Sequence, residues 1–229
     1  MKVLVDGDVI AYRCAWSSNE ETEDEALDKV DALMDDVRFA TAVVEDDIKV
    51  FLTGKGNFRY EVDSDYKANR RDVEKPVHLK AIRDHLIDNW LAVVSEGEEA
   101  DDMIAQEAHA LGYKCIIASI DKDFLQLPCR HYNFNKGEWS FQTEWDAKVF
   151  FYTQILTGDK ADNVQGIYGI GPKKAEKLLS ECKTEEDLLT KVVDAYEGKG
   201  GYERMLVVAN LLWLRREKGV SWVPPAALP

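Results

Sequence analysis

Acidic residues come close together at three places in the chain, and clustered carboxylates are a common ligand set for divalent metal ions. The places are the segment from Glu99 to Asp102, the pair Asp121 and Asp123, and the pair Asp159 and Asp162. Neighbouring carboxylates repel one another and raise one another's pKa unless cations offset their charge. Hard oxygen ligands suit Mg²⁺ or Mn²⁺. The pattern therefore predicts a metal site and, with it, metal-assisted hydrolysis of phosphodiester bonds.

Any one of these acids has an ordinary alternative role, because Asp and Glu often face solvent or cap helices. A cap requires one acid, whereas residues 99–102 contain three acids. Asp121 and Asp123 also follow an apolar run directly, and Asp102 begins a helical pattern with apolar turns. Together these features favour a metal cluster over independent caps.

Alternating strands and helices would bring the acids to one edge of a sheet. Apolar runs predict strands at residues 2–5, 48–52, 91–94 and 113–119. Apolar residues at helical spacing predict helices at residues 23–43, 76–90, 100–111, 184–196 and 201–217. The alternation in the first half indicates a mostly parallel sheet with helices on both faces, in which ligands gather at the carboxyl ends of the strands. Asp6, Glu99 and Asp121 each follow a predicted strand, so we expect them to meet.

A glycine-rich segment, GIYGIGPKKAEKLL, begins at Gly166 and runs into a further predicted helix. Gly166, Gly169 and Gly171 allow a tight turn and a close approach of the backbone. The free amides of the helix N-terminus, with Lys173 and Lys174 beside them, suit a phosphate group. Such a contact would grip a nucleic-acid backbone without reading its sequence. An ordinary helical hairpin with a glycine turn is the alternative.

The segment YKANRR, from Tyr66 to Arg71, combines an aromatic side chain with basic ones. Charge and stacking of this kind can hold single-stranded nucleic acid. Most basic clusters are only solvated, but this one follows a strand of the predicted sheet. We therefore expect Tyr66, Lys67 and Arg70 to contact a nucleic-acid substrate.

The composition sets limits on the partners and the location of the protein. The 229 residues carry a formal net charge of −14, which predicts weak and salt-sensitive binding of DNA. Part of this charge lies in the acidic cluster, where metal ions would offset it. No apolar run approaches the ~20 residues that span a membrane. The four cysteines form no CxxC pair, so we expect no zinc site and a cytoplasmic protein of a bacterium or a phage-infected cell.

Taken together, these motifs resemble the 5′-nuclease (flap endonuclease) superfamily, which includes phage 5′-3′ exonucleases and the 5′-nuclease domain of bacterial DNA polymerase I. The resemblance extends from Met1 to about residue 180, through the ordered motifs LVDGDVIAYR, NFRYEVDSDYKANR, EEADD, SIDKD, GDKADN and GIYGIG. It implies a PIN-like α/β catalytic core over residues 1–142, with a short arch segment near residues 55–76. It also implies a helical DNA-binding part over residues 143–229, with a helix–three-turn–helix element at residues 158–180.

The resemblance implies roles for particular residues. Asp6, Lys67, Arg70 and Asp121 are the implied catalytic residues, and Arg13 would lie near the substrate phosphate. The glycine-rich element would grip duplex DNA and could bind K⁺ through its backbone carbonyls. The implied ligands of two Mg²⁺ or Mn²⁺ ions are Asp6, Glu99, Asp101, Asp102, Asp121, Asp123, Asp159 and Asp162.

Two features depart from the family pattern. The family usually carries a further acid after the second strand, where this chain has FLTGKGN, with Thr53 and Gly54 near the equivalent place. The stretch between Lys67 and Glu99 is also short and leaves little chain for a large arch. One contact to a metal ion could therefore be missing, and whether a 5′ end is threaded or clamped stays open.

The sequence thus predicts a metal-dependent 5′-nuclease that hydrolyses DNA at 5′ ends or at flap and branch junctions through two metal ions. Two alternatives stay open. The first is a ribonuclease of the same superfamily that removes RNA primers from RNA·DNA hybrids, since no residue reads a 2′-hydroxyl group. The second is a branch-binding protein with impaired catalysis. The retained acids count against it, because a pure binding surface would gain from losing their repulsion.

Overall fold

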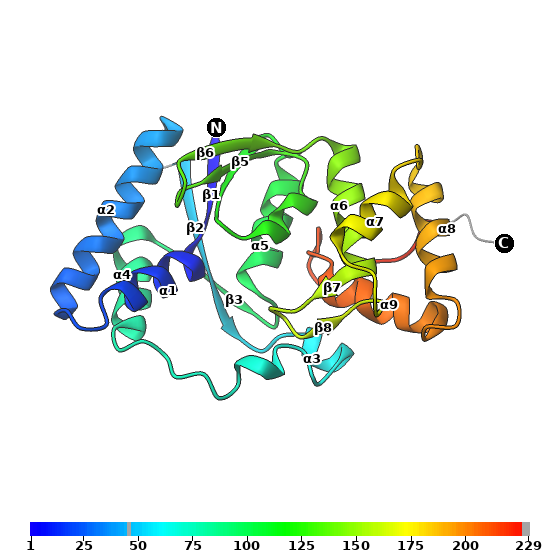
Figure 1. The fold of residues 1–229 in the computed structure, drawn as a ribbon. Coiled ribbons are helices and arrows are strands. Elements are labelled where there is room, and N and C mark those ends of the chain that lie inside the picture. Colours follow the sequence, from blue (N-terminus) through cyan, green and yellow to red (C-terminus); the bar gives the residue numbers. More distant parts are fainter. Residues whose placement is uncertain (45–46, 226–229) are drawn as a thin grey trace.

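A six-stranded sheet in the order β3-β2-β1-β4-β5-β6 forms the centre of the molecule (Figure 1). The computed structural model describes residues 1–44 and 47–225. The strands are β1 (Lys2–Asp6), β2 (Ile48–Lys55), β3 (Val93–Glu96), β4 (Cys115–Ala118), β5 (Arg130–Asn133) and β6 (Glu138–Phe141). Neighbouring strands are parallel, except that β6 is antiparallel to β5. The predicted mostly parallel sheet is confirmed, and the β5–β6 hairpin is an addition that the sequence pattern did not predict.

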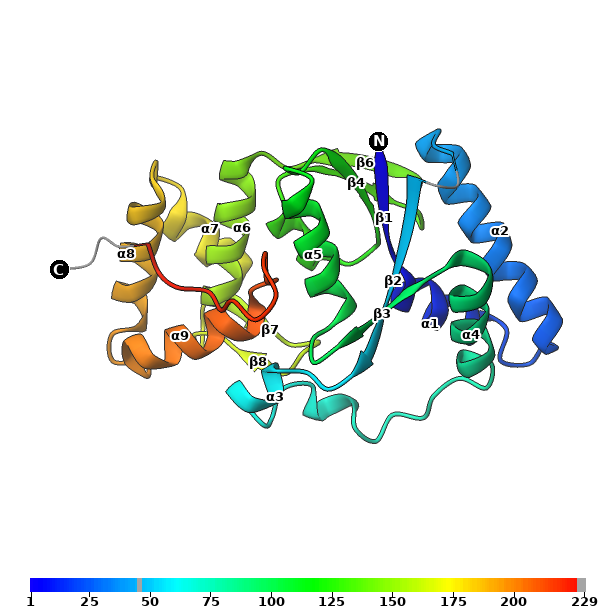
Figure 2. The same cartoon turned by 180° about the vertical axis from the view of Figure 1, so that it is seen from behind.

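Helices cover both faces of this sheet, as predicted (Figures 1 and 2). Because side chains alternate along a strand, Val3 and Val5 pack on one face and Leu4 on the other. The face of Val3 and Val5 is covered by α1 (Gly7–Ser17), α2 (Glu23–Thr41) and α4 (Leu79–Trp90). The face of Leu4 is covered by α5 (Ala100–Ala110). Parallel strands with both faces buried direct their carboxyl ends to one shared edge.

A second core lies beside the sheet and is built mostly from helices of the C-terminal half of the chain (Figure 1). Its elements are α6 (Glu144–Thr157), the short strands β7 (Gly158–Asp159) and β8 (Val164–Gln165), α7 (Pro172–Leu179), α8 (Glu185–Tyr196) and α9 (Gly201–Leu212). Thr143 starts α6 through a capping box with Asp146. Within the described residues, no helix is long and apolar enough to cross a membrane. The last four residues of the predicted helical part, 226–229, lie outside the described chain.

Two helix boundaries differ from the prediction by three residues or more. The helix predicted from Pro76 begins three residues later, at Leu79, and Pro76 lies in the preceding coil. The helix predicted over residues 201–217 ends at Leu212. The chain after Leu212 is extended, because polar side chains of the sheet half bind its backbone groups.

The predicted arch segment is short and folds back onto the helical half. It contains the one-turn helix α3 (Arg59–Val62) and a 3-10 turn, η2 (Ala68–Arg70). Lys67 lies before this turn with a φ of 51°, a left-handed conformation that L side chains rarely adopt. Its backbone N–H donates to the carbonyl oxygen of Asp162 at 2.9 Å. The contact fixes the start of the basic segment against the β7–β8 turn.

Candidate active site

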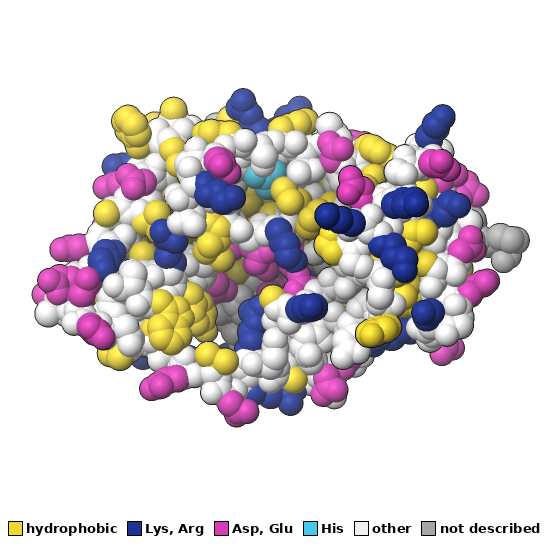
Figure 3. Space-filling view, viewed as in Figure 1, with side chains coloured by type: hydrophobic (Ala, Val, Ile, Leu, Met, Phe, Trp, Pro, Cys, Tyr) yellow, Lys and Arg dark blue, Asp and Glu magenta, His cyan; other side chains and the backbone are white. Residues whose placement is uncertain are grey.

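An open cleft of about 1140 Å³ lies at the carboxyl edge of the sheet. Acidic side chains lie in the hollow at the centre of the face in Figure 3, with Lys and Arg side chains around it. The acids that line the cleft are Asp6, Asp8, Glu96, Glu99, Asp101 and Asp121. The bases are Lys55, Lys67, Arg70, Arg71, Lys75 and Arg83. The cleft therefore pairs an acidic floor with a basic surround, which suits a phosphodiester held against metal ions.

Strands β1 and β4 position two of the acids. Asp6 is the last residue of β1, is 2% exposed, and accepts from the backbone N–H of Val9 at 3.1 Å. Ser119, just after β4, donates its hydroxyl to Asp6 Oδ2 at 2.7 Å and accepts from the backbone N–H of Asp121 at 2.9 Å. One serine thus links the two strand ends, as the convergence of Asp6 and Asp121 on one edge requires.

The N-terminus of α5 supplies the next two acids. Glu99 is the N-cap residue and Asp101 lies in the first turn, where the helix dipole favours negative charge. The hydroxyl of Thr53, from the end of β2, accepts from the backbone N–H of Ala100 at 2.9 Å. The helix is therefore docked on the same sheet edge, and both carboxylates reach the cleft.

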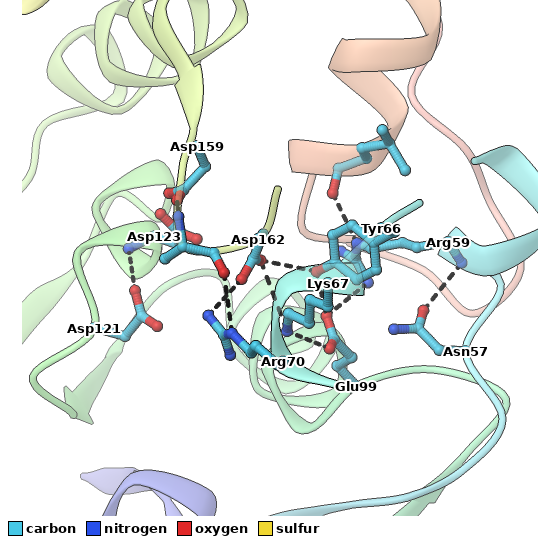
Figure 4. A network of polar contacts seen from close by, with 12 residues as sticks. Asn57, Arg59, Tyr66, Lys67, Arg70, Glu99, Asp121, Asp123, Asp159 and Asp162 are labelled. Atoms are coloured by element: carbon cyan, nitrogen blue, oxygen red, sulfur yellow. Dashed lines mark hydrogen bonds and ion pairs between the residues drawn. The ribbon is translucent and has the colours of Figure 1, made fainter. Parts of the chain in front are cut away.

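Basic side chains of the arch segment bind these carboxylates (Figure 4). Lys67 Nζ lies 2.5 Å from Glu99 Oε1 and 3.6 Å from Asp162 Oδ2. Arg70 donates to Asp162 Oδ1 at 2.7 Å. The predicted neighbours Lys67, Arg70, Glu99 and Asp162 thus come together, although the sequence separates them widely.

The remaining acids form a second group around a lysine that the sequence analysis did not single out. The ammonium group of Lys122 contacts the carboxylates of both Asp123 and Asp159. Asp159 is 6% exposed and also accepts from the backbone N–H of Ala161 at 2.7 Å. Protein cations therefore offset part of each group: Lys67 pairs with Glu99 and Asp162, and Lys122 pairs with Asp123 and Asp159.

The donor set fits divalent metal ions in kind and in charge. Burial, together with the negative charges of Asp8 and Asp121, raises the pKa of Asp6 from 3.8 to about 7. Burial and the charges of Asp6, Glu99 and Asp121 likewise hold the pKa of Asp101 well above its usual range. A bound cation would stabilise the ionised form of such carboxylates. Over residues 1–44 and 47–225, no three acidic, His or Cys side chains converge closely enough to hold an ion as they stand.

Two predicted roles are corrected by the contacts of the side chains. Asp102 was predicted to be a metal ligand, but it is 0% exposed and binds Arg59 in a two-pronged ion pair, at 2.6 and 2.9 Å. Tyr66 was predicted to stack on nucleic acid, but it is 2% exposed and donates its hydroxyl to Glu99 and Asp162. Both side chains face the protein interior, because partners distant in sequence satisfy them there.

The absent acid near Gly54 has a structural explanation. Strands β2 and β3 approach so closely that a Cβ atom at Gly54 would lie 2.0 Å from the carbonyl oxygen of Ser95. A carboxylate missed by the sequence analysis, Asp8, lies beside this position. Its Oδ2 accepts from the backbone N–H of Thr53 at 2.8 Å, and its other oxygen binds Arg83. The signal that could have identified Asp8 is its position two residues after Asp6, the acid at the end of β1.

The glycine-rich element forms a turn before α7, at the place predicted for phosphate contact. Gly169 has a φ of 79°, which favours glycine, and the N–H of Ile170 donates to the carbonyl of Ile167 at 3.0 Å. Lys174 Nζ donates to the carbonyl of Gly169 at 3.2 Å. The same short segment contains Gly166, Gly171 and Lys173.

Arg13, which the resemblance places near the substrate phosphate, is exposed on α1 and is not among the residues that line the cleft.

The parallel sheet with its acidic edge, joined to a helical part, is the fold of the 5′-nucleases. The chain belongs to the family of the 5′-3′ exonuclease N-terminal resolvase-like domain, whose model matches residues 1–154. The resemblance drawn from the motifs is thereby confirmed.

Relatives of known name agree with this assignment. A DNA polymerase I of Rhizobium leguminosarum is 34% identical over 177 residues, which cover 71% of this chain and 17% of the polymerase. A flap endonuclease Xni of Shewanella sp. (strain MR-4) is 32% identical over 143 residues, which cover 56% of this chain and 55% of the relative. The matched part thus spans about half of that flap endonuclease and a small part of that polymerase.

Solved structures share the fold. The T5 D15 protein, co-crystallised with metal ions, superimposes with a TM-score of 0.69 at 17% identity, covering 92% of this chain and 88% of that one. The catalytic core of Rad2, in complex with a DNA substrate, gives a TM-score of 0.57 at 14% identity, covering 97% and 83%. At these identities the likeness establishes the architecture, including the C-terminal helical part.

Proposed function

We propose that the protein is a metal-dependent 5′-nuclease that hydrolyses DNA phosphodiester bonds at 5′ ends or at flap and branch junctions. The observation that carries this proposal is the cleft in which Asp6, Glu99, Asp101 and Asp121 face a basic surround that includes Lys67. Membership of the exonuclease family supports it, as do the printed names of the relatives.

Two groups of acids would hold the metal ions. Asp6, Glu99, Asp101 and Asp121 form the first group, together with Asp162, which shares Lys67 with Glu99; Asp123 and Asp159, which share Lys122, form the second. Carboxylate oxygens alone suit Mg²⁺ or Mn²⁺ better than softer metals. Bound ions would supply an activated water and stabilise the leaving oxygen of the phosphodiester. A solved 5′-exonuclease of T5 carries bound divalent ions, in that structure zinc.

Lys67 and Arg70 would bind the scissile phosphate. In the structure each is paired with carboxylates, Lys67 with Glu99 and Arg70 with Asp162. A metal ion bound to Glu99 and Asp162 would replace Lys67 and Arg70 as the positive charge beside these carboxylates. Both basic side chains would then be free to bind the phosphate. Burial lowers the pKa of Lys67, but the charges of Glu99 and Asp162 outweigh it and hold the pKa above its ordinary value. The residue would therefore act as a cation and hydrogen-bond donor, and not as a base.

The helical part would bind the duplex beside the cleft. The turn at Gly169 and the N-terminus of α7 offer backbone groups to a phosphate, with Lys173 and Lys174 alongside. The carbonyl of Gly169, which Lys174 now contacts, would also suit K⁺. We propose accordingly that residues 1–142 form the catalytic core and that the helical part from residue 143 binds DNA.

A cleavage assay tests the proposed function. A 5′-labelled flap DNA, a blunt DNA duplex and an RNA·DNA hybrid are incubated with the protein in Mg²⁺, in Mn²⁺ and in EDTA. We expect products from DNA in either metal and none in EDTA, with product lengths that distinguish end trimming from cutting at the branch. Faster cleavage of the hybrid would support the primer-removing ribonuclease instead. Tight binding without products in either metal would support a branch-binding protein.

A further inference from the structure

The last two residues of α9 and the extended segment that follows them, residues 211–216, return from the helical part to the back of the acidic cleft. Three successive carbonyl groups are bound there by buried side chains. Arg59 Nε donates to Leu211 at 2.8 Å, Gln126 Nε2 to Leu212 at 2.7 Å, and Arg59 Nη2 to Trp213 at 2.9 Å. We call residues 211–216 the C-terminal brace, because Arg59 also lies next to Glu99 and Gln126 connects through Gln154 to Asp123.

The next backbone groups of the brace are bound in the same way. The N–H of Leu214 donates to Gln126 Oε1 at 3.3 Å, and the N–H of Arg215 donates to Asp102 Oδ1 at 3.0 Å. Leu214 is 4% exposed and packs in the core beneath α5. With five backbone groups of successive residues bound by buried side chains, the segment has one well-defined position.

One connection runs from the brace to the first group of acids. Arg59 is 1% exposed and binds both oxygens of Asp102. It also lies 3.4 Å from Glu99 Oε2 (Figure 4). Asp102 Oδ2 also accepts from the backbone N–H of Glu99 at 3.2 Å. The first turn of α5, which carries Glu99 and Asp101, is therefore fixed through Arg59 and Asp102 to the brace.

A second connection runs to the other group of acids. Gln126 donates to Gln154 Oε1 at 2.8 Å, and Gln154 donates to Asp123 Oδ1 at 2.7 Å. Both glutamines are buried, at 3% and 4% exposure. Asp123 is therefore oriented by a chain of hydrogen bonds that ends on the backbone of Leu212 and Leu214.

We infer that the C-terminal brace positions both groups of proposed metal ligands, with Arg59, Asp102, Gln126 and Gln154 as positioning residues. The inference rests on the proposed metal site. Groups that orient metal ligands from behind typically change metal affinity by roughly 10- to 100-fold when they are removed. The brace lies beyond residues 1–154, which the family model matches, so this chain supports the proposed ligands with a segment outside that region.

Binding of Mn²⁺ to the full chain without DNA tests the inference independently of catalysis. Free Mn²⁺ is followed by electron paramagnetic resonance for the wild type, for Gln154→Leu and for the double variant Arg59→Met/Asp102→Leu. The double variant removes both charges together, so that no buried charge is left unpaired. Tyr196→Phe is the matched control, because it removes a buried hydrogen bond of 2.8 Å to Ile155 in the helical core that is not one of the hydrogen bonds of the brace.

We expect Gln154→Leu and the double variant each to bind Mn²⁺ roughly 10-fold or more weakly, with cooperative thermal unfolding retained. Tyr196→Phe should lower the melting temperature and leave Mn²⁺ affinity unchanged. Wild-type affinity in Gln154→Leu would contradict the inference even if the double variant failed to fold. A wild type that binds no Mn²⁺ would instead overturn the proposed metal site, before any variant is compared.

Discussion

The ammonium group of Lys67 lies 2.5 Å from a carboxylate oxygen of Glu99, at the point where the arch segment meets the first turn of α5. The same ammonium group lies 3.6 Å from Asp162, on the turn that leads into the helical part. One cation thus contacts acids from both halves of the molecule. This position is where a substrate phosphate and the proposed metal ions would have to meet.

Replacing Lys67 with Met is expected to reduce the cleavage rate roughly 10²- to 10³-fold, because a fixed cation that stabilises the charge on the phosphate is lost. Single-turnover cleavage of flap DNA in Mg²⁺ measures the effect. Lys80→Met is the control, since Lys80 pairs with Asp84 on the surface of α4 with its side chain 88% exposed. A Lys67→Met rate equal to that of the control would remove Lys67 from the catalytic machinery.

The metal-free protein should lose stability as the pH rises from about 4 to about 7. Burial and nearby acids raise the pKa of Asp6 from 3.8 to about 7, so the folded state keeps a proton that the unfolded state releases. The stabilisation from this proton is complete below the unfolded pKa and is lost as the pH rises through the folded pKa.

Thermal unfolding in EDTA, at about pH 5 and about pH 8, measures this loss. Asp6→Asn, which cannot ionise, should show a smaller difference between the two pH values, and Mg²⁺ should restore stability to the wild type at the higher pH. A wild type and an Asp6→Asn variant with the same pH dependence would contradict the prediction.

Sequence patterns recovered the parts of this structure that depend on local periodicity. The strand-end acids Asp6 and Asp121 were predicted to meet because short apolar runs alternate with helical patterns, and the sheet confirms the strands. The burial of Asp102 was not predicted, because its partner Arg59 lies 43 residues away in the chain. The brace was missed for the same reason, since Arg59 binds Leu211 across 152 residues. Pairings of this range leave no local signal.

Gly54→Ala should destabilise the protein, because the new Cβ would lie 2.0 Å from the carbonyl oxygen of Ser95. Forcing an extra carbon atom into packed structure typically costs about 1–3 kcal/mol. Urea unfolding measures the loss. Gly171→Ala is the matched control, as a Cβ there meets nothing within 4 Å and the φ is −97°. If the two variants were equally stable, the close approach of β2 and β3 would not be the reason for glycine at position 54.

Lys173→Gln should weaken binding of duplex DNA in EDTA and lower the slope of log affinity against log salt by about 1, because one phosphate contact is lost. Fluorescence anisotropy over a series of salt concentrations gives the slope. Lys199→Gln, on an exposed turn before α9, is the control and should leave the slope unchanged. An unaltered slope in Lys173→Gln would exclude the α7 N-terminus as a phosphate contact.

The most direct test of the account is the cleavage of a 5′-labelled flap DNA by the wild type and by Asp121→Asn, which keeps the shape of the side chain and removes its charge. We expect Mg²⁺-dependent cleavage by the wild type that stops in EDTA. For Asp121→Asn we expect a loss of cleavage rate of more than roughly 100-fold, with DNA affinity in EDTA unchanged. Wild-type cleavage that persists in EDTA, or full activity of Asp121→Asn, would contradict the claim that the acids of the cleft carry metal-dependent hydrolysis.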